Sequence, residues 1–197
     1  MNVLVILGHP NSGSFNHAVA ETCYTQITKN GHAVVFHDLY KEKFDSFLGA
    51  SNLSNDQEIK QHCSDLKNSD GIIIIHPNWW GQPPAIVKGW LEQVFLPDVA
   101  YTFPKEDLEG LMPKGLLKAQ AALVFNTSNT SDELEEKLYK DPLETLWKNR
   151  VFKFCGISNF KRMNFSVMKD STLDQRTIWL TEIRLLIDTY FPKEYNN

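Results

Sequence analysis

The sequence predicts an α/β fold in which a five-stranded parallel sheet carries helices on both faces. Two apolar runs, Val3–Leu7 and Ile72–Ile75, are short and rich in β-branched residues, without alternating polar positions. This composition is typical of strands that are buried on both faces. Helical stretches separate the strand candidates, and the alternation indicates successive right-handed βαβ units. A chain of 197 residues suits one well-buried unit, so we expect a single domain over residues 1–197.

The remaining elements follow from composition and periodicity. Three weaker strand candidates are Ala33–His37, Ala121–Phe125 and Arg162–Val167. Helices are expected at Asn16–Asn30, Asn55–Asn68, Pro84–Leu96, Ser131–Lys148 and Asp174–Tyr190. The segment Leu96–Lys118 has little periodicity and is the expected long excursion from the sheet. Five strands in a chain of this length indicate a three-layer, flavodoxin-like arrangement.

Residues at the helix ends support these limits. Ser14 is a candidate N-cap of the first helix, and Gly31 lies just past its end. Pro84 stands in the first turn of the third helix, where proline is tolerated, and Pro97 follows its last turn. Pro142 is expected to interrupt the fourth helix, because proline removes a backbone donor.

Charge and cysteine content exclude several function classes. The formal net charge of −4 provides no basic field, so we expect no nucleic-acid partner. The apolar run Val3–Leu7 is too short for a membrane span or a signal peptide, so no integral membrane segment is expected. Cys23, Cys63 and Cys155 are odd in number and form no CxxC pair, which favours the reducing cytoplasm.

The loop after the first strand, Gly8–Asn16, is the first candidate binding segment. In an open parallel sheet, ligands bind beyond the carboxyl ends of the strands, where the strand order reverses. Free N–H groups at a helix start, short polar side chains and His9 favour a phosphate here. Gly8 and Gly13 have P-loop spacing, but Ser14 stands in place of the lysine, and no GxGxxG is present. An ordinary capped turn is the alternative.

Two further loops carry unusual residues. Trp79 and Trp80 are adjacent, so their side chains diverge and cannot easily both be buried at the rim of a sheet. A planar, partly apolar ligand would explain them, and contact with a partner subunit or with the sheet edge is the alternative. Asn126–Ser131 is a run of six small polar residues that can donate to a ligand or cap the next helix. Together the three loops suit a flavin.

These residues resemble the NAD(P)H:quinone oxidoreductase family, whose members have a flavodoxin-like fold. The resemblance runs from the first strand to about Gly156. Its most specific segments are Ser14–Asn16 (SFN), Pro84–Trp90 (PAIVKGW), Ala100–Phe103 (AYTF) and Phe154–Gly156 (FCG). The resemblance implies a flavin-dependent enzyme that transfers hydride from NAD(P)H to a quinone or similar aromatic acceptor by a ping-pong mechanism. FAD is the expected flavin, with FMN as the alternative, and a homodimer is expected.

The resemblance also implies roles for individual residues. The residues expected to bind the flavin phosphates are His9, Ser14, Phe15 and Asn16. Those expected to follow the isoalloxazine ring are Pro77, Asn78, Trp79, Trp80 and Gly81. The residues in place of the family's Thr-Thr-Gly-Gly loop are Asn126, Thr127, Ser128 and Asn129. Tyr101 and Phe103 would wall the substrate site of the neighbouring subunit. Ser128 would stabilise charge on the flavin, and Tyr139 would donate a proton in place of the family's histidine.

Three other functions stay open at this point. A flavodoxin-type electron carrier would bind flavin without being an enzyme, although such carriers usually are more acidic. A regulatory flavoprotein of a membrane transporter is possible, because some members of the family act that way. A flavin-free hydrolase would need a nucleophile and a base, and the sequence has no GxSxG elbow.

Several other polar residues favour structural roles. His76 follows a buried strand, and we expect it to be structural. No metal site is expected, because no metal-ligand spacing is present among His17, His32, His37 and His62. A solvated helix face is expected at Glu133, Glu135 and Glu136. Cys155 follows two apolar residues and is expected to be buried and inert.

Overall fold

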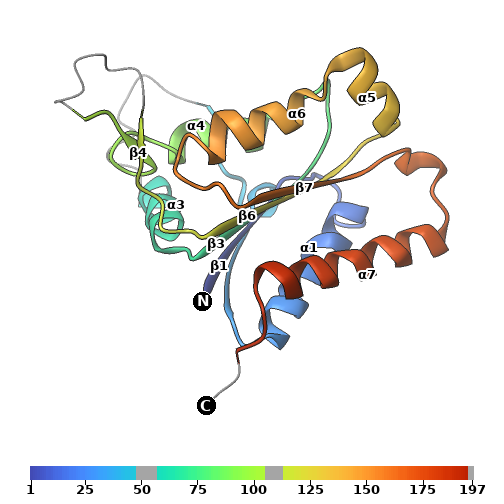
Figure 1. Cartoon of the computed structure of the whole chain (residues 1–197), viewed down its shortest axis with the longest axis horizontal. Coiled ribbons are helices and arrows are strands. Elements are labelled where there is room, and N and C mark those ends of the chain that lie inside the picture. Colours follow the sequence, from blue (N-terminus) through green and yellow to red (C-terminus); the bar gives the residue numbers. More distant parts are fainter. Residues whose placement is uncertain (48–56, 105–112, 195–197) are drawn as a thin grey trace.

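A five-stranded parallel sheet lies at the centre of the molecule, with helices on both faces (Figure 1). The computed structural model describes residues 1–47, 57–104 and 113–194. The strands are β1 (Asn2–Leu7), β2 (Ala33–Asp38), β3 (Gly71–Pro77), β6 (Ala121–Thr127) and β7 (Phe160–Phe165). Their order in the sheet is β2-β1-β3-β6-β7, and all neighbours are parallel. The predicted fold class is confirmed.

The central strands are buried along almost their whole length. Every residue of β3 and β6 is buried, as expected for apolar runs in a parallel sheet. The register pairs Ile75 of β3 with Leu7 on one side and with Phe125 on the other. All three strands end at the same edge of the sheet, with β3 and β6 extending two residues beyond β1. Because the strand order reverses between β1 and β3, the loops that follow them diverge and leave room for a ligand.

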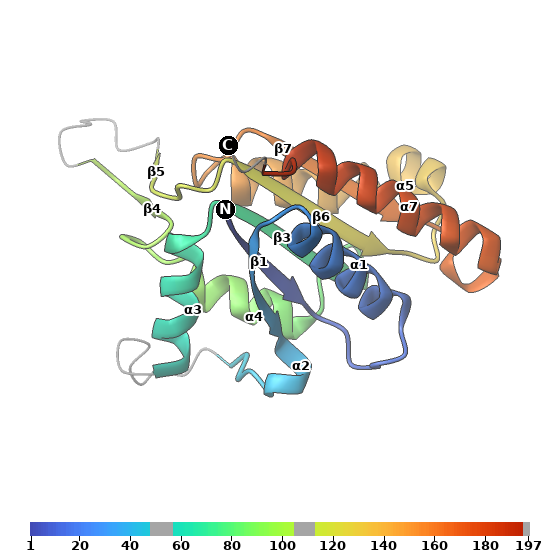
Figure 2. The same ribbon diagram turned by 90° about the horizontal axis from the view of Figure 1, so that it is seen from below.

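Helices cover the two faces of the sheet. They are α1 (Phe15–Lys29), α2 (Leu39–Glu42), α3 (Gln57–Asn68), α4 (Ala85–Val94), α5 (Asp132–Tyr139), α6 (Pro142–Glu144) and α7 (Leu173–Tyr190). A π-helical segment, η1 (Thr145–Phe152), and a short 3₁₀ turn, η2 (Met168–Asp170), complete the set. Helices α1 and α7 pack side by side on one face, whereas α3 and α4 lie on the other (Figures 1 and 2).

Alternate residues of the strands supply the two cores. Val3, Val5 and Leu7 of β1 pack on the α1/α7 side. Leu4 and Ile6 face the opposite core, which contains Trp90 of α4 and Trp147 of η1. This division follows from the two-residue period of side chains along a strand.

The fourth predicted helix, Ser131–Lys148, is interrupted at Pro142 as expected, but its expected end at Lys148 is wrong. Helix α5 ends at Tyr139, and Lys140 and Asp141 both adopt left-handed conformations, with φ of 61° and 43°. Proline disfavours helical geometry in the residue before it, so the break falls on Lys140 and Asp141 and Pro142 opens α6. The helix then continues beyond the expected end as η1, in wider π-helical turns.

The other elements match the expected segments with small differences. The excursion Leu96–Lys118 contains an antiparallel pair of short strands, β4 (Tyr101–Thr102) and β5 (Lys114–Gly115). Strand β7 ends before Val167, whose φ is 53°. The expected start of the second helix at Asn55 lies outside the described residues. No helix of the described ranges is long and apolar enough to cross a membrane. The single domain stays a prediction.

Gly89 of α4 provides a test of the packing. A Cβ atom at this position would lie 2.4 Å from the carbonyl oxygen of Ser46. Alanine is the better helix former by about 1 kcal/mol, but this backbone contact leaves no room for it. We expect Gly89→Ala to lower the free energy of unfolding by roughly 1–3 kcal/mol in urea denaturation. The exposed control Glu92→Ala should change it by less than about 0.5 kcal/mol, and a stabilised Gly89→Ala would contradict the packing.

Candidate functional site

Thr127, the last residue of β6, joins the three loops that the sequence singles out. Its hydroxyl accepts a hydrogen bond from Nδ2 of Asn16 at 2.9 Å. Its carbonyl oxygen accepts a hydrogen bond from the backbone N–H of Asn78 at 2.7 Å. Asn16 lies in the first turn of α1, and Asn78 follows β3. The loops after β1, β3 and β6 therefore meet at one buried residue, as predicted.

The loop after β1 leaves backbone donors free at the start of α1. Ser14 caps the helix, because its Oγ accepts a hydrogen bond from the backbone N–H of His17 at 3.4 Å. The N–H groups of Phe15 and Asn16 have no hydrogen-bond partner in the part of the chain that is described. The side chain of Asn16 is buried, and its Oδ1 also lacks a partner there. A helix start with free donors favours an anion such as a phosphate.

The loop after β3 forms a tight two-residue turn at Trp80 and Gly81. Trp79 and Gln82 exchange backbone hydrogen bonds of 2.9 and 3.1 Å, and the φ angles of Trp80 and Gly81 are 58° and 72°. Two positive φ angles define a type I′ turn, which is unusual for a bulky residue such as tryptophan. The Trp80 side chain is fully exposed, and that of Trp79 is 44% exposed. The expectation that the two adjacent tryptophans are not both buried is confirmed.

A cavity of about 510 Å³ lies between the tryptophan turn and the loop after β6. Its lining consists of Asn78, Trp80, Gly81, Ser128, Asn129, Thr130, Glu135, Tyr139 and Pro142. Ser128 is buried, and its Oγ accepts a hydrogen bond from the N–H of Thr130 at 3.0 Å. The hydroxyl proton of Ser128 is therefore available to a ligand. The cavity combines an aromatic wall with hydroxyl and amide groups.

Glu135 corrects the expected solvated face of α5. Glu133 and Glu136 are exposed, but Glu135 is buried and lines the cavity. Its Oε1 accepts a hydrogen bond from Nδ2 of Asn78 at 3.0 Å. The sequence gives no sign that Glu135 faces inward, because its neighbours are mostly polar and the apolar Leu134 of the same helix is exposed. A contact that joins residues 57 positions apart leaves no local signal.

Several predicted site residues do not reach the cavity. The Asn126 side chain turns toward β7, where its Oδ1 accepts a hydrogen bond from Arg162 at 2.8 Å. Tyr101 and Phe103 pack against Phe154, with ring centroids 4.8 and 6.3 Å apart. His9 stays on the first loop, where its Nδ1 accepts a hydrogen bond from the N–H of Asn11 at 3.1 Å. None of these side chains is among those that line the cavity.

His76 holds the end of β3 in place. Its Nδ1–H donates to the carbonyl oxygen of Pro77 at 2.8 Å, and its Nε2 accepts from the indole N–H of Trp147 at 3.0 Å. This pair of bonds fixes one neutral tautomer, because an indole N–H is only a donor. Burial lowers the pKa of His76 to about 4. His76 therefore positions the strand end that carries Asn78, in line with the structural role expected for it.

A histidine cluster lies apart from this cavity. The ligand atoms of His37, Glu42 and His62 lie within 4.8 Å of one another, although the sequence spacing gave no sign of this. Nδ1 of His62 is 3.1 Å from the indole N–H of Trp90, so it accepts and Nε2 carries the proton. Both nitrogens of His37 face carboxylates, Glu42 at 3.1 Å and Asp65 at 3.0 Å. The cluster is therefore a hydrogen-bonded network in which His62 offers no free lone pair toward a metal.

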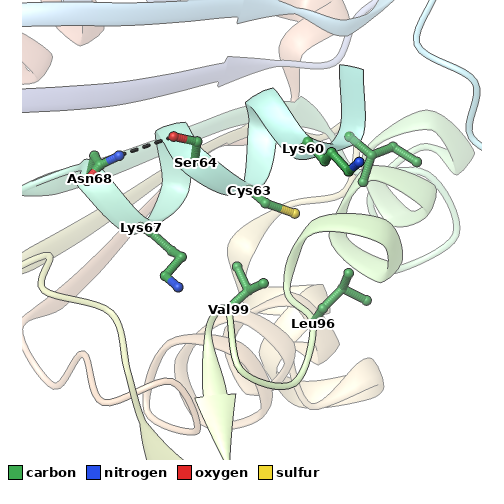
Figure 3. Close-up of a pocket in the computed structure, with 8 residues that line it drawn as sticks. Lys60, Cys63, Ser64, Lys67, Asn68, Leu96 and Val99 are labelled. Carbon is green, nitrogen blue, oxygen red and sulfur yellow. Dashed lines mark hydrogen bonds between the residues drawn. The ribbon is translucent and has the colours of Figure 1, made fainter. Parts of the chain in front are cut away.

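A second cavity, of about 500 Å³, lies between α3 and the segment after α4 (Figure 3). Cys63 points into it from α3, opposite Leu96 and Val99. The Cys63 thiol is 3.7 Å from the carbonyl oxygen of Val94, and burial raises its pKa. The thiol is therefore a protonated donor. Because no residue of the three loops lines this cavity, we assign the candidate site to the cavity at the tryptophan turn.

Comparisons of sequence identify the family of the chain. A family model described as a flavodoxin-like fold matches residues 1–178. An uncharacterized NAD(P)H oxidoreductase of Haemophilus influenzae is 34% identical over 167 residues, which cover 81% of this chain and 80% of that protein. The NAD(P)H dehydrogenase [quinone] 1 of Cavia porcellus is 26% identical over 180 residues, covering 78% of this chain and 64% of that protein. The resemblance stated from the sequence is confirmed.

Comparisons of structure show the same fold. The Streptococcus mutans protein Smu.1420 superposes with a TM-score of 0.84 at 28% identity, covering 96% of this chain and 100% of that protein. An FMN-dependent NADH-azoreductase of Bacillus anthracis in complex with FMN has a TM-score of 0.76 at 14% identity, covering 97% and 100% of the two chains. At that low identity, the second likeness supports the fold alone.

Two of the buried histidines, His62 and His76, predict how stability depends on pH. Burial lowers the pKa of His76 and that of His62 to about 4, from 6.5 in the unfolded chain. Below pH 6.5 the unfolded state therefore binds more protons, and the free energy of unfolding falls as the pH falls toward 4. We expect a loss on the order of 2 kcal/mol per histidine between pH 7 and pH 5 in urea denaturation. His62→Gln should roughly halve this loss, and a flat profile would contradict the prediction.

Proposed function

This chain belongs to the flavodoxin-like fold family, and from this premise we propose that it is a flavin-dependent oxidoreductase that transfers hydride from NAD(P)H to a quinone or similar aromatic acceptor. The observation that carries the proposal is the junction at Thr127, where a helix start, a tryptophan turn and a polar cavity meet. The names of two relatives support it: an NAD(P)H oxidoreductase and an NAD(P)H dehydrogenase [quinone].

The residues around Thr127 fit a flavin. The free N–H groups of Phe15 and Asn16 suit its phosphate, and the buried, unpartnered Oδ1 of Asn16 marks an unmet polar contact. The isoalloxazine ring would lie along the tryptophan turn and the loop of Thr127 and Ser128. When bound, the flavin would supply the exchange of hydride between nicotinamide and acceptor, which no side chain of the site can carry out.

The protein's own contribution is orientation and proton delivery. Asn78 and Thr127 hold the turn and the strand ends at fixed positions, and the Ser128 hydroxyl can donate to a polar ring edge. Tyr139 lines the cavity with a half-exposed side chain, so its hydroxyl can give the acceptor the proton that accompanies hydride. NAD(P)H and the acceptor would use this one cavity in turn, which is the basis for a ping-pong mechanism.

Three finer points complete the proposal. We favour FAD because of the Ser14–Asn16 segment, while FMN, named for the Bacillus azoreductase, is the alternative. A homodimer would cover the exposed apolar side chains at the cavity rim, namely Trp80 and Tyr139, together with Leu138 of α5. A cytoplasmic location suits the three cysteines, all of which are free.

Flavin retention tests the binding site directly. We expect purified protein to release a flavin that absorption and mass identify as FAD or FMN. Asn16→Ala and Trp80→Ala should each raise the dissociation constant of the flavin by about tenfold or more, because each removes about 1.4 kcal/mol of contact energy. The control Asn68→Ala, on α3, should leave it unchanged. Unchanged flavin occupancy in both variants would contradict the assignment of Asn16 and Trp80 to the flavin-binding site.

Turnover tests the reaction. The flavin-loaded protein should consume NAD(P)H steadily with a quinone and give parallel lines in double-reciprocal plots, as a ping-pong mechanism requires. Tyr139→Phe should lower kcat for the quinone by roughly 10²-fold if its hydroxyl delivers the proton, with flavin content unchanged. A protein that takes up electrons once and does not turn over would instead fit a flavodoxin-type carrier.

A further inference from the structure

We propose that Glu135 makes the cavity select acceptors by charge. Neutral and cationic planar rings are favoured over rings that carry sulfonate or carboxylate groups. The inference rests on the proposed function, because it names the class of acceptor for the same cavity. Glu135 is a buried carboxylate on α5, a helix whose sequence is mostly polar.

Glu135 faces the cavity with one oxygen unengaged. Its side chain is only 8% exposed, and its Oε1 accepts the hydrogen bond from Asn78. Within the described ranges its Oε2 has no hydrogen bond. Because Glu135 lines the cavity and Oε2 is not among the fully buried atoms, this oxygen is open to the cavity. The negative charge is therefore presented to whatever occupies the cavity.

No positive charge offsets Glu135. The residues that line the cavity include no lysine, arginine or histidine. The nearby cations are engaged elsewhere: Lys137 pairs with Glu133 at 2.6 Å, and Arg162 pairs with Asp141 and Glu144. Lys140 is exposed and does not line the cavity. Glu135 has no ion pair among the described residues, so the cavity as a whole carries one negative charge.

The charge acts where water screens it weakly. Two unit charges near a protein surface interact several times more strongly than they do in bulk water. A sulfonate on a ring in this cavity would therefore be repelled by Glu135, whereas an unsubstituted ring would be little affected. The overall charge of −4 adds repulsion of the same sign, but salt screens that distant contribution. The two contributions can be separated by ionic strength and by substitution.

The test compares two probes on the flavin-loaded protein. Dissociation constants of 1,4-naphthoquinone and 1,4-naphthoquinone-2-sulfonate are measured by isothermal titration calorimetry, which needs no turnover. Wild-type protein should bind the sulfonate at least about tenfold more weakly than the unsubstituted quinone. In Glu135→Gln the ratio of the two dissociation constants should fall by about tenfold. Glutamine keeps the shape and can still accept from Asn78. The matched control Glu136→Gln removes the same charge from an exposed position on α5 and should leave the ratio within about twofold.

The inference would be overturned if the ratio of the two dissociation constants is unchanged in folded Glu135→Gln. It would also be overturned if neither probe binds. Should that variant not fold, Thr130→Lys places a cation on the same cavity wall without altering Glu135. It should tighten sulfonate binding about tenfold, and no change would overturn the inference equally. The proposed function fails separately: a charge-dependent ratio without NAD(P)H-dependent turnover supports the role of Glu135 but not the reaction. Steady turnover with an unchanged ratio overturns only the role of Glu135.

Discussion

The candidate site depends on the position of Thr127 at the end of β6. The register places Thr127 opposite Pro77 of β3, and the Asn16 and Asn78 hydrogen bonds then close on it. A slip of one residue would turn the Thr127 hydroxyl to the opposite face of the sheet. The apolar faces of β3 and β6 forbid this slip, because it would exchange the residues of the two cores. Core packing therefore sets the geometry of a polar junction.

A second layer of contacts fixes the far wall of the cavity. The Arg162 guanidinium bonds Glu144 at 3.1 Å and Asp141, which lies in the left-handed break between α5 and α6. This break carries Tyr139 and Pro142 to the cavity. Pro142 approaches the tryptophan turn so closely that a Cβ on Gly81 would lie 2.9 Å from its Cγ. Glycine is therefore favoured there both by its positive φ and by the lack of space.

The features that depend on period and topology could be predicted from the sequence. Uninterrupted β-branched runs predicted the buried strands, and parallel topology then brought Asn16, Asn78 and Thr127 to one edge. Side-chain directions that depend on distant partners could not be predicted in this way. Asn126 is predicted at the site beside Thr127, but its side chain bonds Arg162 of β7, a partner 36 positions away in the sequence. Glu135 looked solvated, since only the contact with Asn78 distinguishes it from Glu133.

Asn78 couples the two parts of the cavity that contribute shape and charge. Its Oδ1 accepts from the N–H of Gly81 at 2.9 Å, while its Nδ2 donates to Glu135. The two bonds use the nitrogen and the oxygen of one amide group, so a 180° rotation of that amide would break both of them. The turn that exposes Trp80 and the carboxylate that charges the cavity are thus held by a single side chain. An aspartate at this position could still accept from Gly81 but would face Glu135 with a like charge. The aromatic wall and the charge preference are therefore expected to depend on the same amide.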